Sequence, residues 1–339
     1  MDKNATSGDV SARDIRARDI ITGVQKNFTV IFEAPFTPPP DLEALRADYL
    51  AYLRDSYQHL DIKGIVQVQR VAPSIPLAAV YVPLKARPQR ADTGEGWVRV
   101  AGRYLCSEDL SAEVLAGMPS AGRGASPVPV EVALQSEPAV VVLGDPGAGK
   151  STLLKIIALA LAEQPEGPLP ILLPLNAYAR WLLNRGEVNL LDFAGEYYAS
   201  RQKKLASVGA LFEAALRDEQ AVVLLDGLDE VQTERAFLVR LVQDFVAESV
   251  PTPVDSDRAI PGNRAVVTSR IVGYDEAPLA GRQWRIYTLT DFDRADIERF
   301  VSGWTLAFEI GVHGSDTSIT REAAERERHD LLEAIFTRP

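Results

Sequence analysis

The chain has 339 residues, a length that allows about two domains of roughly 150 residues each. Its composition of 46% hydrophobic and 24% charged residues is typical of a folded globular protein and excludes a disordered or collagen-like chain. The 36 Lys and Arg residues against 47 Asp and Glu residues give a net charge of −11, which argues against a general nucleic-acid binder but leaves a local basic patch open. The single cysteine, Cys106, excludes an intramolecular disulfide framework and a cysteine-rich zinc site.

The apolar runs of the chain are too short to cross a membrane, which would need about 20 apolar residues in succession. The long run Leu153–Ala162 is itself interrupted by Lys155. The first twenty residues carry charges throughout, which does not fit a signal peptide. We therefore expect no membrane association and a cytoplasmic location.

Residues 1–40 are expected to be an N-terminal segment that ends in a linker. The linker is predicted from the proline-rich stretch Pro35–Pro40, which favours an extended backbone. Just before it, Phe28–Phe32 is short, apolar and β-rich, and this composition predicts a strand.

Residues 41–128 are expected to form a small region of helix and strand. The apolar residues of Asp41–Leu53 follow helical spacing, and Asp41 can cap the helix. The run Val80–Leu84 predicts one more short strand. The part from 86 to 128 is rich in Gly, Ala, Pro, Ser and Arg, which predicts an irregular connection.

From residue 129 onward, short β-rich runs alternate with helical stretches. This alternation predicts a mostly parallel sheet with helices on both faces, an α/β fold of three layers (α/β/α), over residues 129–310. A charged amphipathic helix is expected over 311–339. The expected strands are Ala139–Leu143, Ile171–Leu175, Ala221–Leu225, Arg264–Thr268 and Arg285–Leu289, and the expected helices lie near 150–163, 177–185, 190–217, 232–249 and 293–309.

A glycine-rich stretch directly follows the first of these strands and matches the pattern G-x-x-x-x-G-K-[ST]. In this pattern the backbone N–H groups and the N-terminus of the next helix surround phosphates. Lys150 would lie near the β- and γ-phosphates, Ser151 would bind Mg²⁺, and Thr152 would lie beneath the α-phosphate. A chain of this size should match the pattern by chance on the order of 0.01 times, so we predict nucleotide binding. The expected nucleotide-binding residues are Gly144, Asp145, Pro146, Gly147, Ala148, Gly149, Lys150, Ser151 and Thr152.

Three acidic residues follow the third strand. Asp226 comes directly after the buried run and has the position of an Mg²⁺ ligand. Asp229 or Glu230 could polarise the water that attacks the γ-phosphate. The alternative is that these two residues merely cap the helix that begins near Thr233. An acid pair so close to the Mg²⁺ ligand favours hydrolysis of ATP or GTP over phosphoryl transfer to a metabolite.

The fourth strand ends in Arg270, which would reach the same edge of the sheet and could contact the γ-phosphate. The alternative is an arginine that is simply solvated at the end of a strand. His59, His313 and His329 have no metal-ligand spacing and are interpreted as surface or structural residues.

At three stretches the sequence resembles the NACHT group of STAND P-loop ATPases, relatives of the innate immune receptors of animals and of bacterial defence proteins. The stretches are Gly144–Thr152, Leu224–Glu230 and Val267–Arg270, and the run Asp-Gly-Leu-Asp-Glu is the specific one. The resemblance covers roughly residues 130–310. It implies the sheet order 5-1-4-3-2, with the strands numbered along the chain.

The resemblance also implies roles for individual residues. It suggests ATP rather than GTP as the nucleotide, self-association in a full-length context, and a protein effector of unknown kind. Family members normally continue into a helical and a winged-helix domain, so we interpret residues 311–339 as the first helix of a missing helical domain. The implied roles are phosphate binding for Lys150, Mg²⁺ binding for Ser151 and Asp226, water activation for Asp229 or Glu230, and γ-phosphate sensing for Arg270.

Three functions compete at this stage. The first is an ATP-dependent switch in defence or stress signalling, with slow turnover or none. The second is an ATPase motor of the AAA+ type, for which Arg282 is a candidate trans-acting arginine. The third is a non-catalytic fragment that binds nucleotide weakly. Steady turnover by the chain would separate the motor from the other two.

Overall fold

The computed structural model describes residues 40–60, 74–89, 126–185, 189–231, 235–250, 262–279 and 283–337. The elements named below belong to one unit, Leu42–Pro339. The predicted strand Phe28–Phe32, Cys106 and the candidate arginine Arg282 lie outside the described residues.

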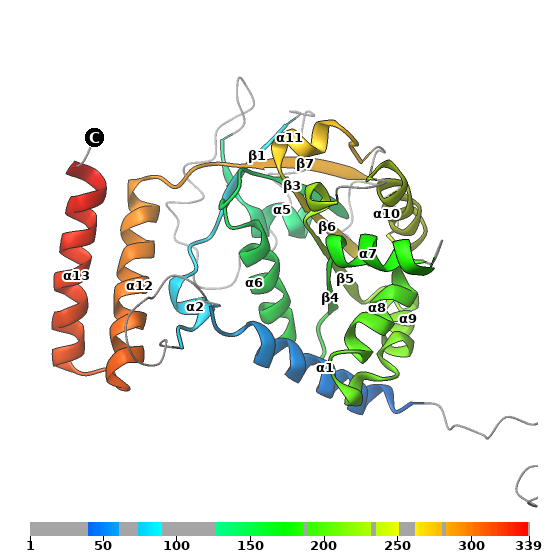
Figure 1. The fold of residues 1–339 in the computed structure, drawn as a ribbon, viewed down its shortest axis with the longest axis horizontal. Coiled ribbons are helices and arrows are strands. Elements are labelled where there is room, and N and C mark those ends of the chain that lie inside the picture. The colour runs from blue at the N-terminus through cyan, green and yellow to red at the C-terminus, as the bar shows by residue number, and fades with distance from the viewer. Residues whose placement is uncertain are drawn as a thin grey trace, which may run out of the picture. The chain divides into compact units, whose positions relative to one another are not determined.

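A seven-stranded sheet in the order β2-β1-β7-β3-β6-β5-β4 forms the centre of this unit (Figure 1). The strands β7, β3, β6, β5 and β4 are parallel, and they follow the order 5-1-4-3-2 expected from the sequence. The difference is that β1 and β2 extend the sheet beyond β7 in antiparallel pairing. The strands are β1 (Lys85–Pro88), β2 (Val128–Pro129), β3 (Ala139–Leu143), β4 (Leu169–Pro174), β5 (Ala221–Asp226), β6 (Arg264–Ser269) and β7 (Trp284–Leu289).

Helices cover both faces of the sheet, which confirms the predicted α/β class. Alternate residues of a strand face opposite layers, so Val140 and Val142 of β3 pack with α5 and α6, whereas Val141 packs with the layer of α7 to α10. All five residues of β3 are therefore buried. The longer helices are α1 (Leu42–Tyr57), α5 (Val130–Ser136), α6 (Lys150–Ala162), α7 (Leu175–Arg185), α8 (Leu190–Ala199), α9 (Val208–Arg217), α10 (Arg235–Ser249), α12 (Arg294–His313) and α13 (Ser318–Thr337). The short ones are α2 (Leu77–Val80), α11 (Ile271–Asp275) and the 3₁₀ turns η1 (Lys203–Leu205) and η2 (Leu228–Glu230).

The helix α1 lies against the edge strand β4 and joins the same core. The hydroxyl of Tyr49 donates a hydrogen bond to the carbonyl oxygen of Pro170 at 2.8 Å, and the hydroxyl of Tyr198 donates to that of Leu172 at 2.5 Å. The rings of Tyr49 and Tyr198 meet edge to face, 5.0 Å apart. Both tyrosines are fully buried, so their hydroxyls satisfy carbonyls of β4 from the side on which the sheet has no further strand.

The strand predicted over Val80–Leu84 is wrong in its position. Val80 ends the short helix α2, and the strand β1 begins five residues later, at Lys85. Pro83 has no N–H group to donate to a ladder, and this removes one bond from the predicted strand. β1 instead pairs with the exposed edge of β7, with Ala86 opposite Leu289.

The single helix expected over 190–217 is also wrong, because the structure divides it into α8, η1 and α9. The division allows α8 and α9 to pack closely at two glycines. A Cβ atom on Gly195 would lie 3.2 Å from the Cα of Gly209. Helical periodicity continues across the break, which is why the sequence pattern did not reveal it.

The helices α12 and α13 form a hairpin at the C-terminal end of the described chain (Figure 1). α12 begins with a capping box in which Asp293 and Asp296 bond each other's backbone N–H groups. The ammonium group of Lys85 on β1 lies 2.7 Å from Asp293 and 2.8 Å from Asp296. These ion pairs connect the start of the hairpin to β1, one of the two strands that extend the sheet beyond β7.

Candidate functional site

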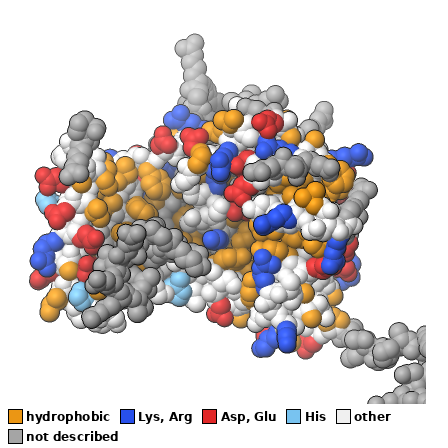
Figure 2. Space-filling view, viewed as in Figure 1, with side chains coloured by type: hydrophobic (Ala, Val, Ile, Leu, Met, Phe, Trp, Pro, Cys, Tyr) orange, Lys and Arg blue, Asp and Glu red, His pale blue; other side chains and the backbone are white. Residues whose placement is uncertain are grey.

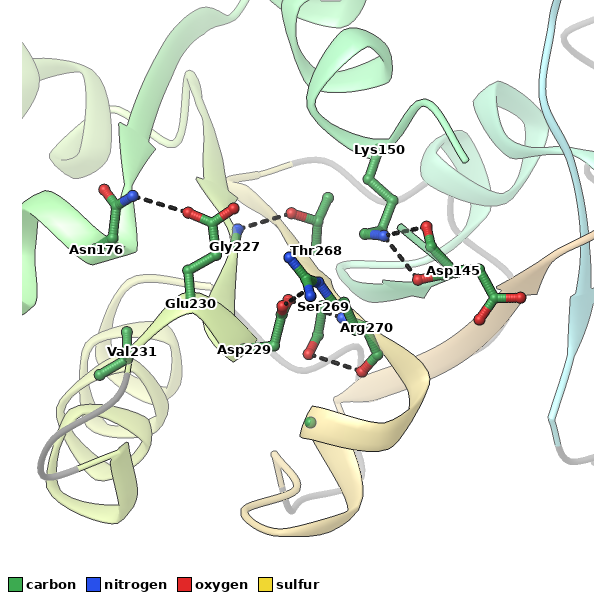
Figure 3. A network of polar contacts seen from close by, with 12 residues as sticks. Asp145, Lys150, Asn176, Gly227, Asp229, Glu230, Val231, Thr268, Ser269 and Arg270 are labelled. Carbon is green, nitrogen blue, oxygen red and sulfur yellow. Dashed lines mark hydrogen bonds and ion pairs between the residues drawn. The ribbon is translucent and has the colours of Figure 1, made fainter. Parts of the chain in front are cut away.

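The sheet brings the predicted site residues to one edge, where the parallel strands end. Leu143, the last residue of β3, pairs with Ser269, the last residue of β6. Leu225 pairs with Val267 in the neighbouring pair of strands, which places Asp226 at the same level. The glycine-rich loop, the acidic residues and Arg270 therefore meet at the carboxyl edge of the sheet, the usual ligand position in parallel α/β folds (Figure 3).

The loop between β3 and α6 has the backbone geometry of an anion site. Gly147 and Gly149 adopt left-handed conformations with φ of 82° and 86°, which other residues rarely adopt. No acceptor among the described residues is bonded to the N–H groups of Gly149, Lys150 and Ser151 at the start of α6. These N–H groups and the positive end of the helix dipole can bind phosphate.

Lys150 is the first residue of α6, and its side chain is bonded to carbonyl groups of the preceding loop. Its ammonium group donates to the carbonyl oxygen of Gly144 at 2.7 Å and to that of Asp145 at 2.9 Å. Partial burial lowers the pKa of Lys150, and the positive charge of Arg270 adds to this, whereas the nearby Asp229 opposes it. The cation is thus partly desolvated and bonded to neutral groups that a phosphate can replace.

Asp226 is oriented by the neighbouring strand β6. The hydroxyl of Thr268 donates to Oδ1 of Asp226 at 2.7 Å and accepts a hydrogen bond from the N–H of Gly227 at 2.9 Å. The other carboxylate oxygen of Asp226, Oδ2, has no hydrogen-bond or ion-pair partner among the described residues.

These residues fit a magnesium ion. Mg²⁺ in such sites is held by one or two protein oxygens together with phosphates and water, so Asp226 and the exposed hydroxyl of Ser151 are suitable donors. No group of three or more His, Cys, Asp or Glu side chains that could hold a metal occurs in the described part of the chain.

Asp229 and Arg270 are bonded to each other in two ways. One carboxylate oxygen of Asp229 lies 2.9 Å from Nε of Arg270, and the other accepts the main-chain N–H of Arg270 at 2.8 Å (Figure 3). The Asp229 side chain is only 6% exposed, whereas that of Arg270 is 52% exposed. Arg270 is therefore anchored at its base and accessible at its guanidinium.

The turn that carries Asp229 is supported from two sides. The guanidinium of Arg235 donates to the carbonyl oxygen of Asp229 at 2.9 Å and to that of Gly273 at 3.0 Å. A Cβ atom on Gly273 would lie 2.6 Å from Cβ of Asp229, so only glycine lets α11 approach the turn this closely.

Glu230 points away from Asp229 toward α7. Nδ2 of Asn176 donates to Oε2 of Glu230 at 2.8 Å (Figure 3). Asn176 lies two residues after Pro174, which pairs with Asp226 on the neighbouring strand β5. This register brings the side chains of Asn176 and Glu230 together. The two acidic residues predicted to activate water thus have different partners, Arg270 for one and an amide for the other.

Sequence reasoning missed four residues that shape this site. Thr268 was part of a recognised stretch but received no role, and its signal was a polar residue near the end of a buried strand. Asn176 and Gly273 had no local signal, since each acts on a residue more than 35 positions away. Arg235 bonds Asp229 only six positions before it, but it also bonds Gly273, 38 positions after it, and no local pattern indicates that pair of contacts.

Comparison with known proteins identifies the family of the chain. The family model of the NACHT domain matches residues 138–307. Among solved structures, the chain is similar to one from the HORMA:CdnC:Trip13 complex of E. coli MS115-1, with 17% identity and a TM-score of 0.33, over 58% of this chain and 60% of that one. It is also similar to the ORC2 protein of Aeropyrum pernix in its ADP form, with 14% identity and a TM-score of 0.29, over 59% and 58% of the two chains. The chain thus spans 60% or less of the length of these structures. A search of curated proteins finds no match.

The described helices range from short turns to the 20-residue helices α12 and α13. None of them is both long enough and apolar enough to cross a membrane.

Proposed function

The chain belongs to the NACHT family of nucleotide-binding NTPases, and we propose that it acts as an ATP-dependent molecular switch in signal transduction, in defence or in the response to stress. The proposal includes a cytoplasmic location, self-association in a full-length context and a protein effector. ATP is preferred to GTP on the resemblance of the acidic run Asp226–Glu230 to that of the NACHT group.

The observation that supports a switch is the way in which the two cations of the site are held. Lys150 is bonded to two carbonyl oxygens of its own loop, and Arg270 is paired with Asp229. Both sets of bonds can be exchanged for phosphate oxygens, because guanidinium and ammonium groups bind phosphate with charge-assisted hydrogen bonds. Binding of a triphosphate would then free the carboxylate oxygen of Asp229 that faces Nε of Arg270, and this change of partners is a two-state element.

A bound nucleotide with Mg²⁺ supplies the phosphoryl group and the charge that polarises it. In this site, Lys150 and the N–H groups at the start of α6 would hold the phosphates. Asp226 and Ser151 would hold the metal, with Thr268 keeping the Asp226 carboxylate in position. Arg270 would bind the γ-phosphate once it leaves Asp229.

Slow hydrolysis is the proposed chemical activity. A water-directing acid must have a free carboxylate oxygen near the γ-phosphate. Asp229 is bonded to Arg270 through both oxygens, and Glu230 is bonded to Asn176. Asp229 would have to release Arg270 before it could activate water, whereas Glu230 keeps one carboxylate oxygen outside its bond to Asn176 but points toward α7. This arrangement supports a switch with slow turnover over a motor.

The test is binding of ATP to the full chain in the presence of Mg²⁺, measured by isothermal titration calorimetry. Lys150→Ala should weaken binding by about 100-fold or more, because it removes charge-assisted contacts worth about 1.5–3 kcal/mol each with two phosphates. Lys204→Ala is the matched control, since Lys204 is an exposed lysine whose one ion pair with a described residue is that with Asp48, at 3.4 Å. It should change the affinity less than twofold.

Two outcomes would contradict the proposal. If the Lys150→Ala variant binds ATP as tightly as the unchanged chain, the assigned phosphate site is wrong. If the unchanged chain hydrolyses ATP steadily at 1 s⁻¹ or faster, on the order of typical enzyme turnover, a motor replaces the switch.

A further inference from the structure

A shallow groove of about 370 Å³ lies on the outer surface of α7 and α8, outside the nucleotide site. In the space-filling view, the area of these two helices shows blue and orange side chains next to each other (Figure 2). Three aromatic and three arginine side chains dominate the lining of the groove. They are Trp181, Phe193, Tyr197, Arg180, Arg185 and Arg201.

The aromatic side chains form one continuous layer beneath the groove. The ring of Phe193 lies 5.5 Å from that of Trp181 and 5.4 Å from that of Tyr197. Phe193 is 3% exposed, so this ring anchors the layer in the core. Trp181 and Tyr197 are partly exposed and carry the layer to the surface.

Two of the arginines lie over these rings. The guanidinium carbon of Arg201 is 3.4 Å from the centre of the Tyr197 ring, and that of Arg185 is 5.4 Å from the centre of the Trp181 ring. Stacking on an aromatic face restricts a guanidinium group and leaves its outer face open. The groove therefore presents flat, cationic surfaces held in fixed positions.

The charges of the groove do not cancel. Among the described residues that line the groove, Glu196 is the one acidic residue, and it accepts hydrogen bonds from Arg185 and from Nε1 of Trp181. Arg201 donates to the carbonyl oxygen of Tyr197 at 2.7 Å, a neutral group, and forms no ion pair with a residue that the structure describes. The guanidinium of Arg180 has no hydrogen bond or ion pair with any described residue. Three positive charges thus face one negative charge in a chain whose net charge is −11.

A ligand that complements these features needs a flat aromatic group and an anionic group a few ångströms away. A nucleobase can stack on a guanidinium plane or an aromatic face, and its phosphate can bind a free arginine. An aliphatic anion would bind the positive charges of the groove but would not stack on its aromatic rings and guanidinium groups. We propose that this groove binds a nucleobase with its phosphate, either as a free nucleotide or as part of a single-stranded nucleic acid.

The groove is separate from the ATP site. None of its lining residues belongs to the glycine-rich loop, the acidic turn η2 or the end of β6. It is also a local basic patch, a feature that the net charge of −11 does not exclude.

The test uses the full chain carrying Lys150→Ala, so that the ATP site does not contribute. Binding of a fluorescein-labelled ten-residue oligothymidylate is followed by fluorescence anisotropy, with unlabelled GMP as a competitor. Arg180→Glu combined with Arg201→Glu should weaken binding at least tenfold. Both positions are exposed, and the gentler variant Arg180→Gln provides a second measurement if the double variant unfolds. Arg240→Glu, on the exposed side of α10, is the matched control and should change binding less than twofold.

The two ligand sources give different results. Competition by GMP at concentrations close to those of the oligonucleotide indicates a free nucleotide, whereas competition only by the oligonucleotide indicates a single strand. The proposal is overturned if neither ligand binds, or if Arg240→Glu weakens binding as much as the groove variants do. It is also overturned if an abasic oligonucleotide or a phosphotyrosine peptide competes as well as the oligothymidylate, because stacking of a base would then have no role.

Discussion

The carboxylate of Asp229 holds Arg270 at two points, the guanidinium Nε at 2.9 Å and the main-chain N–H at 2.8 Å. The first contact involves an exposed, movable group, whereas the second fixes the end of β6. A bound phosphate can therefore compete for the guanidinium without disturbing the strand. The ATP affinity of this site should depend on how strongly Asp229 retains Arg270.

Asp229→Asn should tighten binding of ATP two- to fivefold. The substitution removes the ion pair, worth up to about 1 kcal/mol for a partly exposed pair, while an amide oxygen can still accept the Arg270 N–H. Calorimetric titration with ATP and ADP checks this prediction. The gain should be confined to ATP, because ADP has no γ-phosphate for Arg270; an equal gain for ADP would show that Arg270 does not contact that phosphate.

Asp226→Asn should remove the dependence of ATP affinity on Mg²⁺. An asparagine at this position can still accept the hydroxyl of Thr268 through its oxygen, so the fold should be retained. The ratio of dissociation constants measured in EDTA and in Mg²⁺ should fall to about 2 or less, because the metal loses its carboxylate ligand. Asp244→Asn, on exposed α10, should leave the ratio unchanged, and an unchanged ratio in the Asp226 variant would exclude Asp226 as a ligand.

Gly273→Ala should destabilise the protein by about 1–3 kcal/mol, the usual cost of forcing extra atoms into a packed position. The new methyl group would lie 2.6 Å from Cβ of Asp229 and 3.4 Å from its Cα atom. Gly209→Ala is the matched control, since its methyl group would lie 3.7 Å from its nearest neighbour and the residue is in helix α9. Chemical denaturation should show the control to be neutral or stabilised by up to about 1 kcal/mol. A tolerated Gly273→Ala substitution would mean that α11 can move away from the acidic turn.

Glu327→Gln should raise the Tm at pH 7 by about 1–2 °C, on the order of half a kcal/mol for one relieved like-charge contact. Burial and the negative charge of Glu309 on the facing helix raise the pKa of Glu327. A carboxyl group with a raised pKa stabilises the fold when it is protonated, and this contribution is lost as the pH rises above the ordinary value of 4.5 and through the raised value.

The gain from Glu327→Gln should therefore shrink as the pH falls from 7 through the raised pKa toward 4.5, which thermal melts across this range can measure. Glu325→Gln is the control of opposite sign, because hydrogen bonds from Arg328 lower the pKa of Glu325. A gain that persists at low pH, or an equal gain for Glu325→Gln, would contradict the explanation.

The parallel part of the sheet was predictable because its strands carry strong local signals. Runs such as Ala139–Leu143 and Ala221–Leu225 are short, rich in valine and apolar throughout, which is typical of strands buried on both faces. The glycine-rich loop was equally predictable, since Gly147 and Gly149 are required at positions of positive φ. Both features depend on residues that are consecutive in the sequence.

The parts that the sequence did not reveal depend on long-range pairing. Lys85–Pro88 contains two basic residues and a proline and has no β signal of its own, yet it forms β1 by pairing with the edge of β7. The hydrogen bond between Asn176 and Glu230 likewise depends on the register of β4 against β5. The functional roles stay predictions for all six of the residues to which the resemblance assigned one: Lys150, Ser151, Asp226, Asp229, Glu230 and Arg270.

The position of α1 has a practical consequence for anyone who produces this protein. A shorter version that begins at residue 129, where the sequence pattern changes, would keep every parallel strand but lose Tyr49 and the other side chains with which α1 covers β4. The carbonyl of Pro170 would then face water, and an open strand edge attracts the edge of another molecule. We expect such a version to aggregate during purification, whereas one that begins at residue 40 should remain monodisperse in size-exclusion chromatography.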